Sequence, residues 1–243
     1  GNAWQGHVNA SSASGALRAS ARSRRDVVSY SGLALESSFD ANRIDATVGL
    51  GFNGNGRIDA RLRTGWDAYA PLDGNITAAT SELTWLELFS PDIVSPTGQL
   101  DADIQLAGTR AEPLLGGHAR LSAFAAEIPS LAIAIVDGQA SLDAQSDGNA
   151  RISGSLGTGG EGRLAIDGSL GWRSEGTPLQ LRISGDKVLV SDTRDLHAVA
   201  SPDLEVNYAA ARPLQVSGRV LVASARMDLE RLSDGVSTSS DVV

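Results

Sequence analysis

Apolar and polar residues alternate with a period of two along most of this chain, and this pattern limits the folds open to it. The alternation is clearest over residues 98–124, GQLDADIQLAGTRAEPLLGGHARLSAF. Leu100, Ile104 and Leu106 share one side of an extended chain, and the polar residues between them share the other. Such alternation is typical of a β-strand with one apolar and one solvated face.

Residues 98–124 also predict how consecutive strands are joined. We expect Gly108-Thr109 to end the first strand, Pro113 to fix a turn and Gly116-Gly117 to reverse the chain. The return strand then places Ala119, Leu121 and Ala123 on its apolar side. A strand, a punctuated turn and another strand form the unit that the chain repeats.

Similar alternating segments recur roughly every 8–12 residues, which is the spacing of an all-β protein. Near the start, we expect two short strands around an Ala/Ser-rich turn, one with Val8 and Ala10 and one beginning at Leu17. The sequence Asn53-Gly54-Asn55-Gly56 predicts a hairpin. Residues 81–90 break the pattern: their helical spacing predicts one short amphipathic helix that begins at Ser81 and packs across an open end of the sheet.

The apolar faces of these strands predict an elongated, curled open sheet, an incomplete barrel or β-taco with an apolar concave groove. A closed sandwich or barrel is the alternative, but in-phase glycines such as Gly168 and Gly218 favour a bent, open sheet. We predict segments at 1–80 (sheet), 81–97 (helix and linker) and 98–243 (sheet), and one continuous sheet is possible. The side chains expected to line the groove are Ile44, Val48, Leu50, Leu100, Ile104, Leu106, Leu121, Ile133, Ile135, Leu142, Ile152, Leu156, Leu164, Ile166, Leu170, Leu181, Ile183, Leu204, Val206, Val216, Val220 and Val222.

Composition excludes several classes of function. The net charge of −9 disfavours nucleic acid as a partner, and the chain has no cysteine for a disulfide or a thiolate metal site. The three histidines His7, His118 and His197 lack metal-ligand spacing, and the carboxylates of Asp101 and Asp103 fall on the wet side of a strand. We therefore expect no catalytic residue, no cofactor, no metal and no enzymatic activity.

Several segments together resemble the TamB family. They are the 98–121 pattern G-x-L-x-x-x-I-x-L-x-G-T-x-x-x-P-x-L-x-G, the preceding helix 83–89, the sequence Ser201-Pro202-Asp203-Leu204 and the terminal sequence SSDVV at 239–243. The resemblance is to the C-terminal region of the family and is strongest over 81–243. Arg110 departs from the family pattern, because an apolar residue is expected after Gly-Thr.

The resemblance implies a periplasmic location and an anchor in the inner membrane, the anchor lying outside these residues. It implies kinship with AsmA-like and bridge-like lipid transfer proteins and a TamA-like outer-membrane barrel of the Omp85 type as partner. The first hypothesis for function is that the groove shields phospholipid acyl chains in transit between the two membranes. The second is a chaperone for outer-membrane proteins whose open edges pair with nascent strands. A membrane-barrel fragment or an adhesin is a third reading. The barrel is disfavoured because aromatic residues are few and not grouped at strand ends, and the adhesin because the chain lacks a tight fixed repeat.

Overall fold

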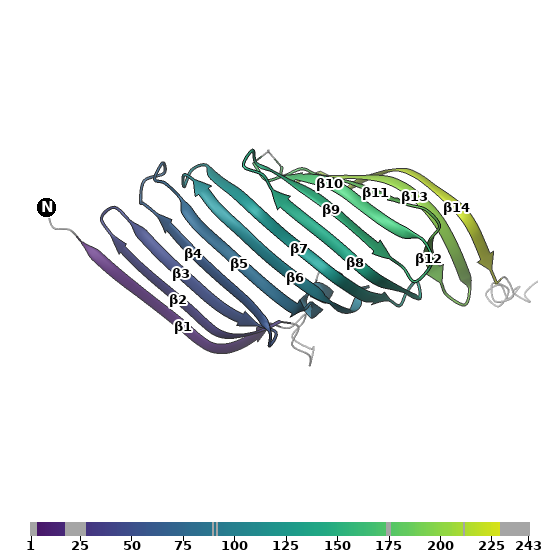
Figure 1. Ribbon diagram of the computed structural model, residues 1–243, viewed down its shortest axis with the longest axis horizontal. Helices are drawn as coiled ribbons and strands as arrows, with labels where there is room; N and C mark the ends of the chain where they lie inside the picture. The colour runs from purple at the N-terminus through teal and green to yellow at the C-terminus, as the bar shows by residue number, and fades with distance from the viewer. Residues whose placement is uncertain are drawn as a thin grey trace, which may run out of the picture.

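The computed structural model describes residues 4–17, 28–88, 90, 92–173, 176–210 and 212–228. These residues form one 14-stranded antiparallel sheet that does not close into a barrel (Figure 1), which confirms the predicted fold class. The strands are β1 (Gln5–Leu17), β2 (Val28–Asp40), β3 (Ile44–Phe52), β4 (Gly56–Thr64), β5 (Asp73–Glu82), β6 (Val94–Gly108), β7 (Pro113–Ile128), β8 (Ile133–Ala144), β9 (Asn149–Gly157), β10 (Arg163–Gly171), β11 (Leu179–Gly185), β12 (Val188–Asp192), β13 (Leu196–Tyr208) and β14 (Gln215–Met227).

Strands β1 to β11 pair in chain order, so the sheet grows by successive hairpins. Strand β5 pairs directly with β6, and the sheet therefore continues without interruption past residues 81–97. Strands β11 and β12 both pair with the same side of β13, the first with residues 203–208 and the second with residues 197–200. They act as one strand that is interrupted near Lys187, whose φ is 49°.

The two ends of the strands form two rims of the sheet. The Trp66 rim carries the connections at 41–43, 65–72, 109–112, 145–148, 172–178 and 209–214, and the helix rim carries those at 53–55, 83–93, 129–132, 158–162 and 193–195. A short 3-10 helix, η1 (Thr84–Leu88), lies at the helix rim, beside the ends of β5 and β6 in Figure 1. The side chain of Leu83, just before it, is fully buried.

β-Bulges bend the strands near the helix rim. Register shifts occur in the pairs β2–β3, β5–β6, β6–β7, β7–β8, β8–β9, β12–β13 and β13–β14, each toward that end of the strands. Ala123 in β7 and Asp137 in β8 have φ values of 49° and 50° at two of these positions. An extra residue bends a strand and changes the phase of its alternation, so the sheet curls at this rim while the same face stays apolar.

A small core forms where β8 and β12 meet at the helix rim. Strands β9 and β10 have nine residues each and end before this rim, so β12 reaches β8 across the turn that joins them. The main-chain N–H of Asp192 donates to the carbonyl of Leu131 at 2.9 Å. The apolar side chains buried in this region include Ile133, Ile135, Val188, Ala198 and Ala200. The other buried apolar side chains among the described residues are Leu83, Pro96, Ala126 and Ala150.

Three local predictions are wrong. The Ala/Ser-rich stretch lies inside the single strand β1, because its small side chains pair in register with β2. The strand predicted to begin at Leu17 falls, after that residue, outside the described residues. The turn after β6 spans residues 109–112, so Gly116-Gly117 lies within β7. Ser81 does not begin the helix: Glu82 still pairs with Thr97, and η1 is a 3-10 helix of five residues that begins at Thr84.

Candidate functional site: an apolar face along the sheet

One face of the sheet carries an uninterrupted row of apolar residues that crosses eleven neighbouring strands. Each member is the direct cross-strand partner of the next, so the row runs along the length of the sheet rather than along any strand. Neighbouring strands are about 4.8 Å apart, and the row is therefore about 50 Å long. Its members are Leu50, Ile58, Ala78, Ala102, Ala119, Leu142, Ile152, Gly168, Leu181, Val206 and Val216.

Two further rows flank the first one on the same face. One contains Leu100, Leu121, Ala140, Gly154, Ile166, Ile183, Leu204 and Gly218. The other contains Val48, Ala60, Ile76, Ile104, Gly117, Ala144, Ala150, Leu170 and Leu179. The face is therefore an aliphatic band about three side chains wide. In the described part of the chain, η1 is the one helix, and no second sheet covers the band.

The structure places all twenty-two side chains predicted to line the groove, and it divides them into three groups. Ile133 and Ile135 are buried in the β8–β12 core, in the part of β8 between the helix rim and the Asp137 bulge. Val216, Val220 and Val222 on β14 are more than half exposed. The remaining seventeen are half-buried, and the strand registers place them together on the apolar face.

Four aromatic side chains on this face are absent from the set predicted to line the groove, although Phe52 continues the apolar alternation of Ile44, Val48 and Leu50. Each of four rings stands directly opposite a glycine on the neighbouring strand and covers it, in the pairs Phe39–Gly6, Tyr30–Gly15, Phe52–Gly56 and Phe124–Gly138. Tyr30, Phe39 and Phe52 stand at or near strand ends. The expectation that aromatics are not grouped at strand ends is therefore wrong for these strands. The sequence contains a signal for these pairs, because each aromatic residue and its glycine occupy opposite positions on two consecutive strands.

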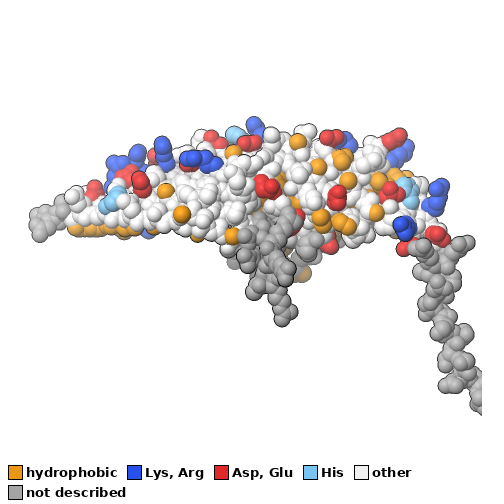
Figure 2. All heavy atoms as spheres, turned by 90° about the horizontal axis from the view of Figure 1, so that it is seen from below, with side chains coloured by type: hydrophobic (Ala, Val, Ile, Leu, Met, Phe, Trp, Pro, Cys, Tyr) orange, Lys and Arg blue, Asp and Glu red, His pale blue; other side chains and the backbone are white. Residues whose placement is uncertain are grey.

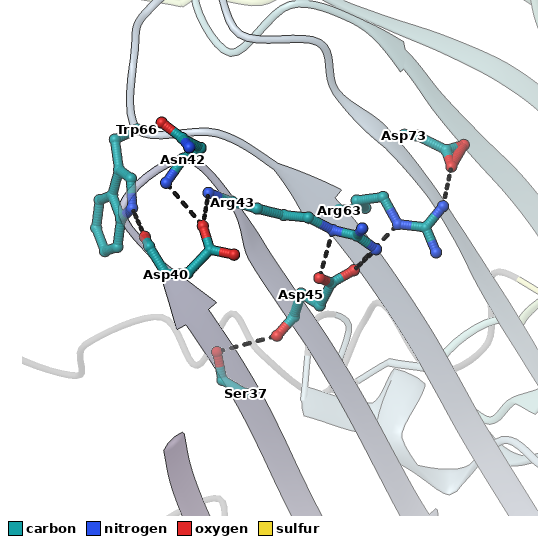
Figure 3. A network of polar contacts seen from close by, with 8 residues as sticks. All are labelled: Ser37, Asp40, Asn42, Arg43, Asp45, Arg63, Trp66 and Asp73. Atoms are coloured by element: carbon teal, nitrogen blue, oxygen red, sulfur yellow. Dashed lines mark hydrogen bonds and ion pairs between the residues drawn. The ribbon is translucent and has the colours of Figure 1, made fainter. Parts of the chain in front are cut away.

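The opposite face is polar and carries ion pairs between adjacent strands (Figure 3). The Asp45 carboxylate accepts hydrogen bonds from Arg43 and Arg63, and Arg63 also lies 3.9 Å from Asp73. The bond from Arg43 holds the pKa of Asp45 below its ordinary value. Arg57 lowers the pKa of Asp59 in the same way. Figure 2 shows charged side chains along one side of the sheet and hydrophobic side chains along the other at its N-terminal end.

Among the residues that the structure describes, the polar face shows no cluster of side chains typical of catalysis or metal binding. Asp101 stands opposite Arg120, and Asp103 stands opposite His118, as in solvated cross-strand pairs. His197 lies 2.8 Å from Asp192 at the β12–β13 hairpin, far along the sheet from the other histidines. Among the described residues, no three His, Asp or Glu side chains could hold a metal ion. A depression of about 480 Å³ on this side lies over β3 to β6, and its lining mixes charged and amide groups such as Asp45, Arg61 and Gln105 with apolar ones such as Leu62 and Ala107.

Comparisons with known families match nearly the whole chain. A model of the TamB N-terminal domain matches residues 1–121, and a model of the TamB C-terminal domain matches residues 136–243. The N-terminal model covers residues 1–80, where the resemblance in the sequence is weaker, and also the 98–121 pattern, which resembles the C-terminal region of the family. Searches of curated proteins and of solved structures found no match. In the described part of the chain, no helix has the length and apolar character needed to cross a membrane. The chain belongs to the TamB family, whose non-enzymatic, inner-membrane-anchored proteins span the periplasm and act in the biogenesis of the outer membrane.

Proposed function

We propose that the apolar face is a groove that shields phospholipid acyl chains while the lipid moves between the inner and outer membranes. The observation that carries this proposal is the direction of the apolar rows. They run from strand to strand for about 50 Å, so an acyl chain can lie on aliphatic side chains at every point along the sheet. The bulges near the helix rim bend the strands, and in this proposal the bend makes the apolar face concave.

The physical chemistry of such a face suits transport better than storage. Each methylene group removed from water contributes about 0.8 kcal/mol, so a partly covered chain of about twelve carbons is held by several kcal/mol. The attraction has no preferred direction. A lipid therefore moves along a uniform row of Leu, Ile, Val and Ala side chains without crossing a deep local minimum.

A charged residue on the apolar face tests the proposal. Ile104 lies between Ile76 and Gly117 in the middle of the sheet, and Gln105 is exposed on the opposite face one residue away. In Ile104→Asp, an ionised carboxylate makes acyl contact unfavourable. We expect this variant to lose most co-purified phospholipid in native mass spectrometry and most transfer between donor and acceptor vesicles.

Gln105→Asp is the matched control, because it adds the same charge to the same strand and leaves the apolar rows intact. We expect it to retain bound lipid and transfer. Circular dichroism checks that both variants keep the β-sheet. If folded Ile104→Asp carries and transfers lipid as well as Gln105→Asp does, the groove does not carry the acyl chains.

A second function is favoured by the exposed edge of the sheet at β14. Every residue from 215 to 227 is exposed, and β14 pairs only with β13 among the described strands. Val220, Leu221 and Val222 expose apolar surface on both faces of this strand. Such an edge can take up a nascent outer-membrane strand by β-augmentation. Photo-crosslinks to nascent barrel strands from β14, with none from Ile104, would favour this chaperone function.

The remaining predictions concern the setting of the protein. A TamA-like barrel of the Omp85 type as partner, a periplasmic location for these residues and the division at residues 81–97 stay predictions. Co-purification of the full-length protein with that barrel, before and after Ile104→Asp, separates partner binding from lipid carriage.

A further inference from the structure

At the Trp66 rim, the apolar face of β1–β4 ends in three aromatic rings that pack on one another. The ring centroids of Trp4 and Phe39 are 5.9 Å apart, those of Trp4 and Trp66 are 5.5 Å apart, and those of Phe39 and Trp66 are 6.0 Å apart. Phe39 lies flat over Gly6, whereas Trp4 and Trp66 are 50% and 46% exposed. The cluster therefore presents indole surface to solvent where aliphatic side chains give way to polar turns.

The orientation of Trp66 in this cluster is fixed. Its indole N–H donates to the main-chain oxygen of Asp40 at 2.7 Å, as Figure 3 shows. The hydrogen-bonding capacity of the indole is thereby used within the protein, and its ring face remains available. Tryptophan is favoured at boundaries of this kind, where one side of the ring is apolar and the other is wet.

Arg110 lies next to this cluster, on the turn between β6 and β7. Its Nη1 donates to the main-chain oxygens of Gly65 at 3.2 Å and Trp66 at 2.6 Å, which hold the exposed guanidinium against the end of β4. Within the described ranges, no carboxylate forms an ion pair with it. A guanidinium has five N–H donors, so Nε and Nη2 keep donors for a ligand. This is the residue that departs from the family pattern.

The carboxylates of Asp40 and Asp67, near this rim, accept hydrogen bonds from main-chain N–H groups of their own turns. Asp40 accepts hydrogen bonds from the main-chain N–H groups of Asn42 and Arg43, and Asp67 accepts one from that of Tyr69. These bonds draw the two carboxylates toward main-chain groups. Glu112, on the same turn as Arg110, lies 3.9 Å from Arg173 instead. In the described part of the chain no carboxylate pairs with Arg110, so its remaining N–H donors can meet a ligand from outside the chain.

On the basis of the lipid-carrying function proposed above, we infer that Arg110 and the Trp4–Phe39–Trp66 cluster bind the phosphate end of a phospholipid whose acyl chains lie on β2–β4. A guanidinium fork matches the oxygens of a phosphate diester, and the two indoles match the ester region between headgroup and chains. Strand β3 has nine residues and is about 30 Å long, whereas one lipid leaflet contributes about 15 Å of hydrocarbon. The apolar face behind the cluster is therefore long enough for the acyl chains.

A fluorescence experiment locates the headgroup. In Trp85→Phe/Trp172→Phe, the remaining tryptophans, Trp4 and Trp66, both belong to the cluster. The protein is loaded from phosphatidylcholine vesicles brominated either near the ester or near the chain methyl end. We expect ester-proximal bromine to quench the cluster at least twofold more strongly than methyl-terminal bromine. Equal quenching by the two lipids, or stronger quenching by methyl-terminal bromine, would overturn the inference.

Substitution of Arg110 tests the phosphate contact. We expect Arg110→Gln to weaken phosphatidylcholine binding roughly threefold to tenfold, and Arg110→Lys to recover part of the loss. Arg194→Gln, in the exposed turn between β12 and β13, removes the same charge at the opposite rim and should bind as the parent protein does. Equal binding by folded Arg110→Gln and Arg194→Gln would contradict the inference.

Competition with inorganic phosphate distinguishes a site for the phosphate of a lipid from a site for a free phosphate ion. Inorganic phosphate alone should neither change cluster fluorescence nor displace the lipid, because it has no acyl chain to hold it. If inorganic phosphate produces the same Arg110-dependent change, the rim is a free-anion site and the lipid assignment is wrong. If the parent protein binds no phospholipid at all, the proposed function fails first. If lipid binds but neither Arg110 nor the cluster responds, only the headgroup assignment fails.

Discussion

Strands β3–β5 and the region β8–β13 have the same alternation of apolar and polar residues, yet they differ in how deeply their apolar side chains are buried. Strands β3–β5 have nine or ten residues each, and β3 and β4 pair without a register shift. Their apolar side chains stay half-buried. In β8–β13, short strands lie between longer ones, and β12 closes on β8 to bury Ile133, Ile135 and Val188.

Unequal strand length and bulges, rather than hydrophobicity, account for this difference. The Asp137 bulge turns the end of β8, and the nine-residue strands β9 and β10 leave room for β12 beside it. Equal strands cannot close in this way, because no edge is free to approach another. The same apolar alternation therefore produces an open face in one half of the sheet and a small sealed core in the other.

The largest expected effect comes from placing one charge in each region. Val188 has no exposed surface, whereas Val48 is half-buried on the open face. We expect Val188→Asp to lower the free energy of unfolding by about 3–5 kcal/mol, because an unpaired carboxylate is buried. Val48→Asp should cost about 1 kcal/mol, since its carboxylate remains hydrated. Chemical denaturation followed by circular dichroism measures both values.

The control is Val190→Asp, two residues from Val188 on the same strand, where the side chain is 36% exposed. It should resemble Val48→Asp rather than Val188→Asp. Equal destabilisation by Val188→Asp and Val48→Asp would mean that the open face is sealed as tightly as the β8–β12 core, and the comparison would fail.

The sequence predicts the strands and the apolar face well because both depend on local alternation. Leu100, Ile104 and Leu106 share the face that the sequence assigns to them, as their cross-strand partners confirm. The bulges at Ala123 and Asp137 could not be predicted. Alanine does not favour a positive φ as glycine does, so nothing local marks the bulge at Ala123. Asp137 tolerates a positive φ and precedes Gly138, but this pair indicates a turn rather than a bulge inside a continuous strand.

Long-range features account for the other failures of prediction. Contact between β12 and β8 depends on where β9 and β10 end, and no short segment contains that information. Trp4, Phe39 and Trp66 are separated by up to sixty-two positions in the sequence, and the register of three hairpins brings their rings together. The sequence shows that Arg110 departs from a family pattern, but it does not show that the guanidinium hydrogen-bonds to the main-chain oxygens of Gly65 and Trp66, which only the fold brings close.

A smaller effect is expected from adjacent glycines in β7, which differ in how closely the neighbouring strand approaches. Gly117 has φ 104°, and a Cβ there would overlap the main-chain oxygen of Asp103, whereas a Cβ at Gly116 meets open space. We expect Gly117→Ala to cost about 1–3 kcal/mol and Gly116→Ala to change stability by less than about 0.5 kcal/mol. Thermal unfolding distinguishes them. Equal melting temperatures would show that this close approach in the middle of the sheet does not constrain the backbone.

The smallest effect concerns pH and the polar side of the open region. Hydrogen bonding to Arg43 and Arg63 lowers the pKa of Asp45 in the folded state, so folding favours the ionised carboxylate. The stabilisation is complete above the unfolded pKa of about 3.9 and is lost as pH falls through the lower folded value. Amide exchange in β3 and β4, corrected for its intrinsic rate, should accelerate below about pH 4 relative to β12 and β13.

Asp45→Asn should remove this difference, because an amide has no charge to lose. Because both partners are solvent-exposed, added salt should also reduce the difference. An unchanged pH dependence in Asp45→Asn would show that the Arg43–Asp45–Arg63 network does not stabilise these strands, and that their stability comes from main-chain pairing alone.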